Sequence, residues 1–286
     1  MSSPKTVLVT GAKGFIGRAT VSALESAGWK VTKGLRSVGQ SLPDGFIALD
    51  LSEPAAILSM AKIARFDAIV HLGAHVGWSG ATESEMFVPN VLSTGCLAYL
   101  AKLWDAQLIF ASAAIVHGVR KEKIESHSPV SPDTAYASSK WLGEQLIMVS
   151  HAHYCVLRIA GVFGCGGPAH LALNRALDAA ARGEIPTVVG SGRAVRNYVY
   201  VKDVAEAIAY ALRMNLVGTH LLAGHEILSI GDMLNAICEQ FLPGARPVSR
   251  EGPEATNQVV QPSSDLPKTR GFREALADIR QEAGGK

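Results

Sequence analysis

The sequence predicts an α/β protein in which a doubly wound parallel sheet is covered by helices on both faces. Strand-like runs recur along the first 160 residues, and a helical pattern separates most neighbouring runs. Strands that alternate with helices form a parallel sheet, because each crossover helix returns the chain to the same end of the sheet. We expect strands at Thr6–Val9, Trp29–Thr32, Phe46–Leu49, Ala68–Leu72, Leu108–Ala111 and Tyr154–Ile159.

Helical periodicity fills the segments between and after these strands. Helices are expected at Phe15–Ala27, Pro54–Ala64, Ser84–Trp104, Pro132–Ser150, Ala169–Ala181, Asp203–Met214 and Ile230–Phe241. The alternation fades from Gly164 onward, and Glu251–Asp265 is polar and loop-like. We therefore expect a sheet domain of residues 1–163, to which residues 195–216 return, and a small C-terminal α/β lobe of residues 164–194 and 217–286.

The composition excludes several classes of protein. Of 286 residues, 48% are hydrophobic, which is enough for a packed core, and the net charge of +2 does not indicate a nucleic-acid binder. The four cysteines are scattered and form no CxxC motif, which predicts reduced thiols and no zinc site. No signal peptide and no uninterrupted apolar span is visible, so a soluble cytoplasmic protein without a membrane partner is expected.

A glycine-rich run follows the first expected strand and opens the first expected helix. Gly11 allows a sharp turn, Gly14 lets the backbone approach a phosphate, and Gly17 lets the helix pack closely on the strand. The helix N-terminus then offers free N–H groups to an anion. The run predicts a dinucleotide pyrophosphate site made by Gly11, Lys13, Gly14, Phe15, Ile16 and Gly17.

Tyr136 and Lys140 are four residues apart in an expected helix, so they lie one above the other on the same face. A tyrosine with its ordinary pKa of about 10 is a poor base at neutral pH. A lysine ammonium one turn away, together with an oxidised nicotinamide ring, would favour the phenolate. We therefore expect Tyr136 to move a proton in a hydride-transfer reaction, with its pKa lowered by Lys140.

Several co-linear motifs, taken together, resemble the extended short-chain dehydrogenase/reductase family, in particular its nucleotide-sugar epimerases, dehydratases and 4-ketoreductases. The resemblance covers roughly residues 5 to 240. Its motifs are TGAKGFIG (10–17), Asp50-Leu51, His71-Leu72-Gly73-Ala74, Asn90-Val91 with Thr94, Val116-His117-Gly118, YASSK (136–140), LRIAGVFG (157–164) and GSGRAVRNYVYVKDVAEAI (190–208).

The resemblance implies a Rossmann-type fold and assigns roles to individual residues. Asp50 and Leu51 would lie at the adenine, and Leu72, Gly73 and Ala74 would pass under the ribose and pyrophosphate. Lys140 would hold the nicotinamide ribose, and Asn90 would support the cofactor site. Arg196 would bind the diphosphate of a nucleotide sugar, for which a guanidinium fork is geometrically suited.

The end of the second expected strand bears on the choice of cofactor. Family members that prefer NAD usually carry an acidic residue there, which binds the ribose diol. Here Leu35 stands at that position, Arg36 follows it, and Lys13 lies in the glycine loop. Two cations without a carboxylate favour a 2′-phosphate, and hence NADP over NAD.

The sequence departs from the family pattern at the third catalytic residue. Counting back from Gly118, Ala113 occupies the place of the usual Ser or Thr. Ser112 is adjacent, but neighbours on an extended strand point to opposite faces. Three interpretations stay open: Ser112 or a water replaces the hydroxyl, Tyr136 suffices alone, or the protein is a weakened or non-catalytic relative.

Two further departures lie near the expected substrate site. His117 stands where a tyrosine is usual, and Gly161 stands where epimerases often carry a sugar-contacting asparagine. We expect both positions, with Ser112 and Ala113, to contact the substrate. Gly161 could make room for a larger substituent or indicate another substrate class.

These observations predict an oxidoreductase or epimerase that acts on a nucleotide-linked sugar, of the 4-epimerase or 4-ketoreductase type. The alternatives are an NADPH-dependent reductase of a non-sugar carbonyl compound and a cofactor-binding relative with little catalysis. Apolar stripes follow Val91, Leu97, Leu100 and Leu103, and also Trp141, Leu142 and Leu146. In the family such helices often pair across a two-fold axis, so a homodimer is expected.

Overall fold

The computed structural model describes residues 4–36, 42–77, 83–150 and 152–284, and the chain divides into two compact units. The first unit contains residues 1–119, 129–158 and 204–220. The second contains residues 120–128, 159–203 and 221–286. The structure therefore assigns the short segment 120–128 to the second unit, whereas the sequence pattern places it in the sheet domain.

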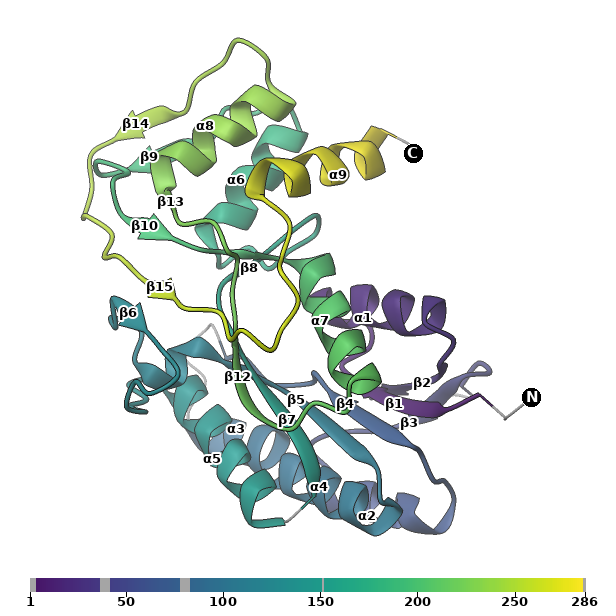
Figure 1. The fold of residues 1–286 in the computed structure, drawn as a ribbon. Helices are drawn as coiled ribbons and strands as arrows, with labels where there is room; N and C mark the ends of the chain where they lie inside the picture. Colours follow the sequence, from purple (N-terminus) through teal and green to yellow (C-terminus); the bar gives the residue numbers. More distant parts are fainter. Residues whose placement is uncertain (1–3, 37–41, 78–82, 151, 285–286) are drawn as a thin grey trace. The chain divides into compact units, whose positions relative to one another are not determined.

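The first unit is built on a seven-stranded sheet of order β12-β7-β5-β4-β1-β2-β3, whose central pairs are parallel (Figure 1). Val9 of β1 lies opposite Lys33 on one side and Val70 on the other. The predicted fold class is confirmed. The strands are β1 (Thr6–Thr10), β2 (Lys30–Leu35), β3 (Phe46–Ala48), β4 (Ala68–His71), β5 (Gln107–Ala113), β7 (His153–Ile159) and β12 (Gly218–Leu222).

Helices cover both faces of this sheet, with α1 on one face and α2, α4 and α5 on the other (Figure 1). The helices are α1 (Phe15–Ser26), α2 (Pro54–Ser59), α4 (Ser93–Trp104), α5 (Ala135–Ser150) and α7 (Val201–Arg213). The 3₁₀ turn η1 (Met60–Lys62) continues α2, and residues 204–213 of α7 belong to this unit. The long helix expected from Ser84 is not uniform, because α3 (Glu83–Met86) leads through the π-helical η2 (Phe87–Leu92) into α4. Pro89 lies inside η2 and has no N–H to donate to the regular helical ladder.

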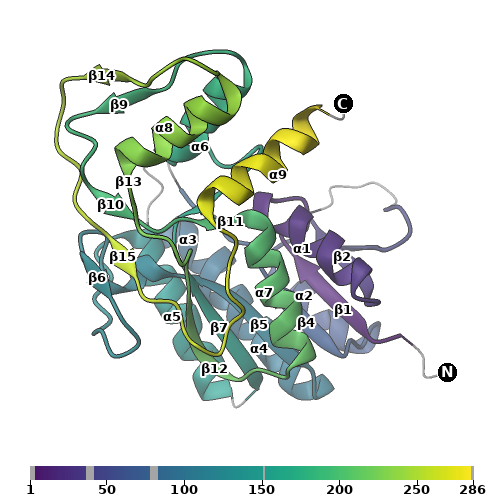
Figure 2. The same ribbon diagram turned by 45° about the horizontal axis from the view of Figure 1, so that its top comes forward.

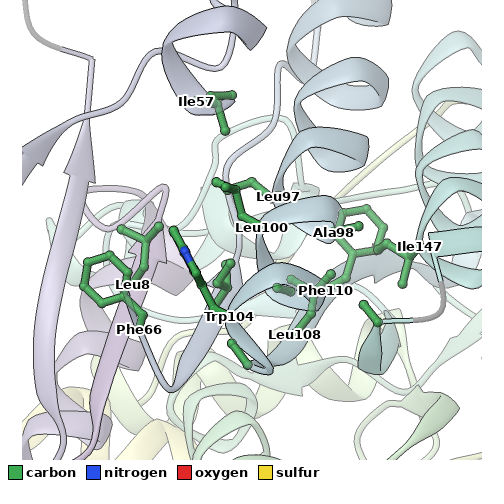
Figure 3. Close-up of a cluster of buried hydrophobic side chains, with 14 of the residues drawn as sticks. Leu8, Ile57, Phe66, Leu97, Ala98, Leu100, Trp104, Leu108, Phe110 and Ile147 are labelled. Atoms are coloured by element: carbon green, nitrogen blue, oxygen red, sulfur yellow. The ribbon is translucent and has the colours of Figure 1, made fainter. Parts of the chain in front are cut away.

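A buried cluster between the sheet and α2, α4 and α5 holds the first unit together (Figure 3). Leu8, Leu108 and Phe110 project from the strands, and Leu97 and Leu100 project from α4. The Trp104 ring meets the Phe66 ring edge to face, with the ring centroids 5.7 Å apart. Each large side chain buried in this way contributes about 1.5–3 kcal/mol. The cluster therefore gives β5 and α5, which carry the candidate catalytic residues, a rigid base.

The second unit packs α8 against both α6 and α9 and carries several short two-stranded pairs (Figure 2). Its helices are α6 (Ala172–Ala181), α8 (Ile230–Phe241) and α9 (Phe272–Gly284). The paired strands are β6 (Lys123–Ile124) with β15 (Val259–Val260), β8 (Val162–Phe163) with β11 (Val199–Tyr200), β9 (Thr187–Val189) with β14 (Val248–Arg250), and β10 (Val195–Arg196) with β13 (Leu228–Ser229).

Within the part of the chain that the structure describes, one helical stretch is long and apolar enough to cross a membrane. Ser84–Trp104 has 21 residues and a mean hydropathy of 1.2, and half of its most apolar window is buried inside the protein. A core helix of a soluble protein passes the same test. Since Leu97, Leu100 and Trp104 belong to the buried cluster, the stretch is accounted for as a core helix of the first unit.

Candidate functional site

The glycine turn after β1 brings three backbone segments into direct contact. Gly11 has a φ of 67°, and a Cβ atom there would lie 2.7 Å from the Gly73 nitrogen. A Cβ atom on Gly17 would lie 2.1 Å from the Gly11 carbonyl oxygen. Neither position can carry a side chain without moving backbone. The ends of β1 and β4 and the first turn of α1 therefore form a bare backbone cradle.

The N-terminus of α1 opens onto this cradle. Gly14 is the N-cap residue, it provides no side-chain cap, and no acidic residue occupies the first turn. The first N–H groups of a helix need an acceptor, and they carry the positive end of the helix dipole. These residues therefore fit the pyrophosphate of a dinucleotide cofactor.

Basic side chains gather where β2 and β3 lie side by side. Lys13 and Lys33 each place the Nζ atom near the ring of Phe46, at 5.9 and 5.5 Å from its centroid. Glu25 pairs with Lys33 at 2.9 Å. Arg36 is exposed and directly follows β2, which runs three residues beyond the expected strand. The longer strand places the Arg36 cation at its carboxyl end.

Asp50 and Leu51 follow β3, as the family resemblance requires for an adenine site. The Asp50 carboxylate accepts a hydrogen bond of 2.8 Å from the Ser52 N–H, which fixes the turn into α2. Leu51 packs towards Gly73, because a Cβ atom on Gly73 would lie 2.7 Å from Leu51 Cδ1. Leu72 and Ala74, on either side of Gly73, are half-buried.

Tyr136 and Lys140 lie on α5 as the helical spacing predicted. The Lys140 Nζ atom is 5.8 Å from the Tyr136 ring centroid and 4.7 Å from that of Phe110, and it donates a 2.8 Å hydrogen bond to the Ala111 carbonyl. Burial lowers the pKa of Lys140 to about 8, opposed by the nearby Glu144 carboxylate. Burial also raises the pKa of Tyr136 to about 12.

The direction of the Tyr136 shift differs from the sequence expectation. The sequence expectation was that Lys140 and an oxidised nicotinamide ring together lower the pKa of the phenol, whereas in the protein alone the loss of hydration on burial raises it. In the protein itself Tyr136 is therefore a protonated phenol at neutral pH. A phenol in that state is a proton donor.

A buried hydrogen-bond chain, which the sequence reasoning did not find, begins at the glycine turn. Thr10 Oγ1 lies 2.7 Å from His71 Nδ1, and His71 Nε2 lies 3.0 Å from Thr94 Oγ1. The Thr94 hydroxyl donates to the Asn90 carbonyl at 2.6 Å, so it accepts from His71 Nε2. Burial, together with Lys140, lowers the pKa of His71 to about 3, so the ring is neutral.

Asn90 continues this chain to the catalytic helix. Its Nδ2 donates to the His75 carbonyl at 2.8 Å and to Ser139 Oγ at 2.9 Å, and its Oδ1 accepts from the His75 N–H at 2.7 Å. Ser139 in turn donates to the Tyr136 carbonyl. Asn90 is 2% exposed, and its amide is used within the protein. It can therefore support the cofactor site by holding α5 against the segment after β4.

A second buried network surrounds Ser112. Glu144 accepts hydrogen bonds from the Ser112 hydroxyl and from Arg158, whose Nη2 is 2.7 Å from Oε2. Arg158 Nη1 lies 3.0 Å from His117 Nε2, and His117 Nδ1 lies 3.0 Å from the Pro129 carbonyl. A guanidinium can only donate, so Nε2 accepts, and Nδ1 carries the proton that bonds to Pro129. His117 is thus held in its neutral form.

Within the second unit, Arg196 and Tyr198 lie beside Gly161. Arg196 pairs with Leu228 of β13 and bridges to Gln258. Its Nη1 atom is buried and has no hydrogen-bond partner within the described part of the chain. A Cβ atom on Gly161 would lie 2.5 Å from Cε1 of Tyr198, so the Tyr198 ring fills the space beside the glycine.

The family model for the NAD dependent epimerase/dehydratase family matches residues 7–227. The chain belongs to this family. The UDP-glucose 4-epimerase 4 of Oryza sativa subsp. japonica is 29% identical over 251 residues, which cover 73% of this chain and 68% of that protein. The dTDP-6-deoxy-L-talose 4-dehydrogenase (NAD(P)(+)) of Kitasatospora kifunensis is 29% identical over 227 residues, which cover 73% of this chain and 70% of that protein.

Solved structures share the fold. The dTDP-4-dehydrorhamnose reductase of Bacillus anthracis str. Ames, in complex with NADP, superimposes with a TM-score of 0.82 over 99% of both chains at 18% identity. The glycine cradle lies within the segment that the family model matches.

For a member of this family, two expected substrate contacts need correction. Ser112 is 4% exposed and its hydroxyl is committed to Glu144, so it does not replace the hydroxyl missing at Ala113. His117 is 3% exposed, and both of its ring nitrogens are engaged within the first unit. Both residues serve the Glu144–Arg158 network instead. Ala113 itself is half-buried at the end of β5.

Of the two interpretations of Gly161, the structure does not support room for a larger substituent, because the Tyr198 ring lies beside the glycine, and another substrate class stays a prediction. The sequence motifs could not reveal this contact between Gly161 and Tyr198, because the two positions are far apart along the chain.

The pKa of Lys140 predicts how activity in this epimerase/dehydratase-family enzyme depends on pH. Lys140 is an ammonium ion below about pH 8 and loses that charge as the pH rises through about 8. We expect kcat/KM to fall over this range, because the neutral amine no longer supports the Tyr136 phenolate formed in reduction. Assays at saturating NADPH between about pH 6 and 10 measure this fall. A profile that stays flat to about pH 9.5 would contradict the assignment.

Proposed function

We propose that the protein transfers hydride between NADP(H) and a carbon of a nucleotide-linked sugar, as a 4-epimerase or 4-ketoreductase. The observation that carries the proposal is the pairing of the half-buried Tyr136 with the buried Lys140 on α5, in the same unit as the glycine cradle. The relatives act at position 4 of nucleotide sugars according to their names, which supports this substrate class.

The residues divide the chemistry between them. A bound nicotinamide would provide the hydride chemistry at the sugar carbon. In the reducing direction, the Tyr136 hydroxyl gives its proton to the carbonyl oxygen, and the Lys140 ammonium stabilises the phenolate that remains. Lys140 also keeps hydrogen-bond donors beyond the one given to Ala111, and these suit the nicotinamide ribose.

Arg196 is proposed to bind the diphosphate of the substrate. Its buried Nη1, which has no acceptor in the described part of the chain, supports this role, since such a nitrogen costs stability in the free protein. A diphosphate oxygen would supply the missing acceptor with a charge-assisted hydrogen bond.

The preference for NADP rests on the cations beside β2 and β3. Lys13 lies at the Phe46 ring, and the carboxylate of Glu25 is engaged with Lys33. The residue that ends β2 is Leu35, which has no carboxylate to bind a ribose diol. The NADP complex of the reductase from Bacillus anthracis shows that this fold can hold the phosphorylated cofactor.

Arg36→Ala is expected to weaken NADPH binding by about 10- to 100-fold, because a charge-assisted hydrogen bond is worth about 1.5–3 kcal/mol. NADH binding should change by less than about two-fold, since NADH lacks the 2′-phosphate. Calorimetric titration of both cofactors measures the difference, and Arg120→Ala, in an exposed charged loop, is the matched control. Equal losses for NADPH and NADH would refute the 2′-phosphate role.

Two experiments test the proposed function directly. Mass spectrometry of the nucleotide released on denaturation identifies a retained cofactor, and NADPH oxidation is then assayed with dTDP- or UDP-linked 4-keto sugars. Retained NAD(H) near one per chain would favour an epimerase and overturn the NADP preference. Binding of neither cofactor would refute the function.

The second candidate function is that of a weakly catalytic protein, because Ala113 lacks the hydroxyl that is usual at this position. Since Ser112 is committed to Glu144, its hydroxyl does not take the place of the missing one. Ala113→Ser should raise a slow activity by about 30- to 800-fold, which corresponds to the about 2–4 kcal/mol that one such donor contributes. Ala114→Ser, at a buried position one residue further on, is the control. An unchanged rate would mean that Tyr136 suffices without the hydroxyl.

A homodimer is proposed from the exposed face of α4 and α5. Leu103 and Leu142 were expected in buried stripes, but they are 53% and 44% exposed, and Tyr99 and Val149 are exposed on the same two helices. An apolar face of this kind marks an interface more often than free surface. Sedimentation equilibrium of the wild-type protein and of the Leu103→Glu variant measures the association, which we expect the charged side chain to weaken. We also propose that the protein is located in the cytoplasm.

A further inference from the structure

The buried hydrogen-bond chain that begins at the glycine turn has a fixed direction. The Gly73 N–H donates to Thr10 Oγ1 at 3.1 Å. The Thr94 hydroxyl uses its hydrogen on the Asn90 carbonyl, so His71 Nε2 carries a proton and donates to Thr94. A neutral ring then has no hydrogen on Nδ1, and this atom accepts from the Thr10 hydroxyl. The chain therefore runs one way, from the Gly73 N–H to the Asn90 carbonyl.

Both ends of this chain are backbone groups, which neither release nor take up a proton at neutral pH. The chain therefore cannot carry a proton to the reacting atoms, and its effect is to fix positions. Thr10, His71 and Thr94 are all 0% exposed, so water cannot replace a hydrogen bond that is lost there. Because each broken link would leave a buried polar group without a partner, the intact chain is strongly favoured over other arrangements.

The two ends of the chain lie at the two parts of the candidate site. Gly73 borders the glycine cradle, because a Cβ atom on Gly11 would lie 2.7 Å from the Gly73 nitrogen. At the other end, the Asn90 side chain donates to Ser139 Oγ on α5 at 2.9 Å. Ser139 lies between the two candidate catalytic residues of that helix. The chain thus joins the cradle to the turn of α5 where the chemistry is expected.

A ring contact brings the chain close to Lys140 as well. The His71 and Phe110 rings pack with their centroids 5.4 Å apart, and the two residues are paired across β4 and β5. Lys140 Nζ lies 4.7 Å from the centroid of the same Phe110 ring. An uncharged imidazole suits this place, because a second buried cation would be repelled by the Lys140 ammonium. The hydrogen bonds and the nearby cation therefore require the same neutral form of His71.

We infer that His71 is a positioning residue that couples the glycine cradle to the catalytic helix, so that occupation of the cradle and the position of Tyr136 depend on each other. This inference rests on the proposed function. A pyrophosphate bound at the glycine turn would restrain the backbone around Thr10 and Gly73, and the directed chain would pass that restraint on to α5. His71 acts through its neighbours and needs no contact with the sugar.

Thr94→Val tests the coupling, because valine keeps the branched shape of threonine and removes the hydroxyl to which His71 donates. The matched control is Thr20→Val in α1. Thr20 is also 0% exposed, and its hydroxyl donates to the carbonyl four residues back, that of Ile16, at 2.9 Å. The probe is 2′-phosphoadenosine 5′-diphosphate, which carries the diphosphate for the cradle but has no nicotinamide ribose to reach Lys140. Hydrogen exchange followed by mass spectrometry reports on α1 and α5 separately.

We expect the bound probe to slow amide exchange in both α1 and α5 of the wild type and of Thr20→Val. In Thr94→Val the protection of α1 should remain and that of α5 should be lost. NADPH should bind this variant about five- to ten-fold more weakly, at the lower end of the usual range for coupled sites. Equal protection of α5 in Thr94→Val and the wild type, or none in the wild type, would overturn the inference and leave the proposed function intact. A wild-type protein that binds neither the probe nor NADPH would overturn both.

A second measurement uses the wild-type protein alone. Nitrogen NMR of protein with labelled histidine, with the His71 signals assigned through contacts to the Phe110 ring, should place the His71 proton on Nε2. The signals should not titrate between about pH 5 and 8, because burial lowers the pKa of this ring to about 3. His117 provides an internal contrast, since its hydrogen bonds place the proton on Nδ1. A His71 proton on Nδ1, or a ring that titrates in this range, would reverse the direction of the chain and overturn the inference.

Discussion

Tyr136→Phe is expected to lower kcat for hydride transfer by about 100- to 10,000-fold, the range that general acid–base catalysis contributes. The change removes one oxygen from a ring that burial keeps as a protonated phenol, with a pKa raised to about 12. Phenylalanine retains the packing on α5. The hydrogen bond that ties this turn of α5 to another segment joins Asn90 to Ser139 and does not involve the Tyr136 hydroxyl. NADPH affinity and thermal stability should therefore remain close to those of the wild type.

Single-turnover oxidation of bound NADPH measures the loss without interference from product release. Tyr154→Phe is the matched control, because Tyr154 is a half-buried tyrosine that packs against the core of the same unit. A Tyr136→Phe enzyme that retained more than a tenth of the wild-type rate would exclude the phenol as the proton donor. The proposal would then have to place the proton on a water or another group.

The local parts of this protein were predictable from the sequence because their physical causes are local. The glycine turn at Gly11, the α1 start at Phe15 and the Tyr136–Lys140 spacing follow from backbone sterics and helical periodicity. Six of the seven strands of the sheet were predicted within a few residues of their ends, whereas β12 (Gly218–Leu222) was not predicted. The α9 helix was missed, because charged residues interrupt its apolar positions and the polar residues before it suggested a continuing loop.

The features that were wrongly predicted depend on contacts between distant residues. Ser112 and His117 were placed at the substrate because their strand end faces the cofactor in the family, but buried partners from α5 and β7 take their polar atoms. Burial raises the pKa of Tyr136 in the protein alone, and the lowering expected from Lys140 together with an oxidised nicotinamide stays a prediction. Gly161 has no free space beside it because Tyr198 fills it. Such pairings cannot be derived from a pattern along one chain.

Removing one partner of the Glu144–Arg158 pair is expected to destabilise the protein by about 3–5 kcal/mol, the cost of leaving a buried charge without its counter-charge. The side chains of Glu144 and Arg158 are 0% and 9% exposed. Glu144→Ala would leave the Arg158 cation facing the neutral His117 ring, and it would leave Ser112 without its acceptor. Urea unfolding monitored by circular dichroism measures the change in the free energy of unfolding.

The matched control is Glu184→Ala, which breaks the Arg182–Glu184 pair, whose side chains are both 61% exposed. That change should cost less than about 1 kcal/mol, because water already solvates both groups. The double variant Glu144→Leu/Arg158→Met should be more stable than Glu144→Ala, since no buried charge remains at these two positions. If Glu144→Ala cost no more than the exposed control, the ion pair would not stabilise the fold. If the double variant recovered stability but lost catalytic activity, the network would be required for positioning α5 rather than for folding, because Glu144 lies one turn beyond Lys140 on that helix.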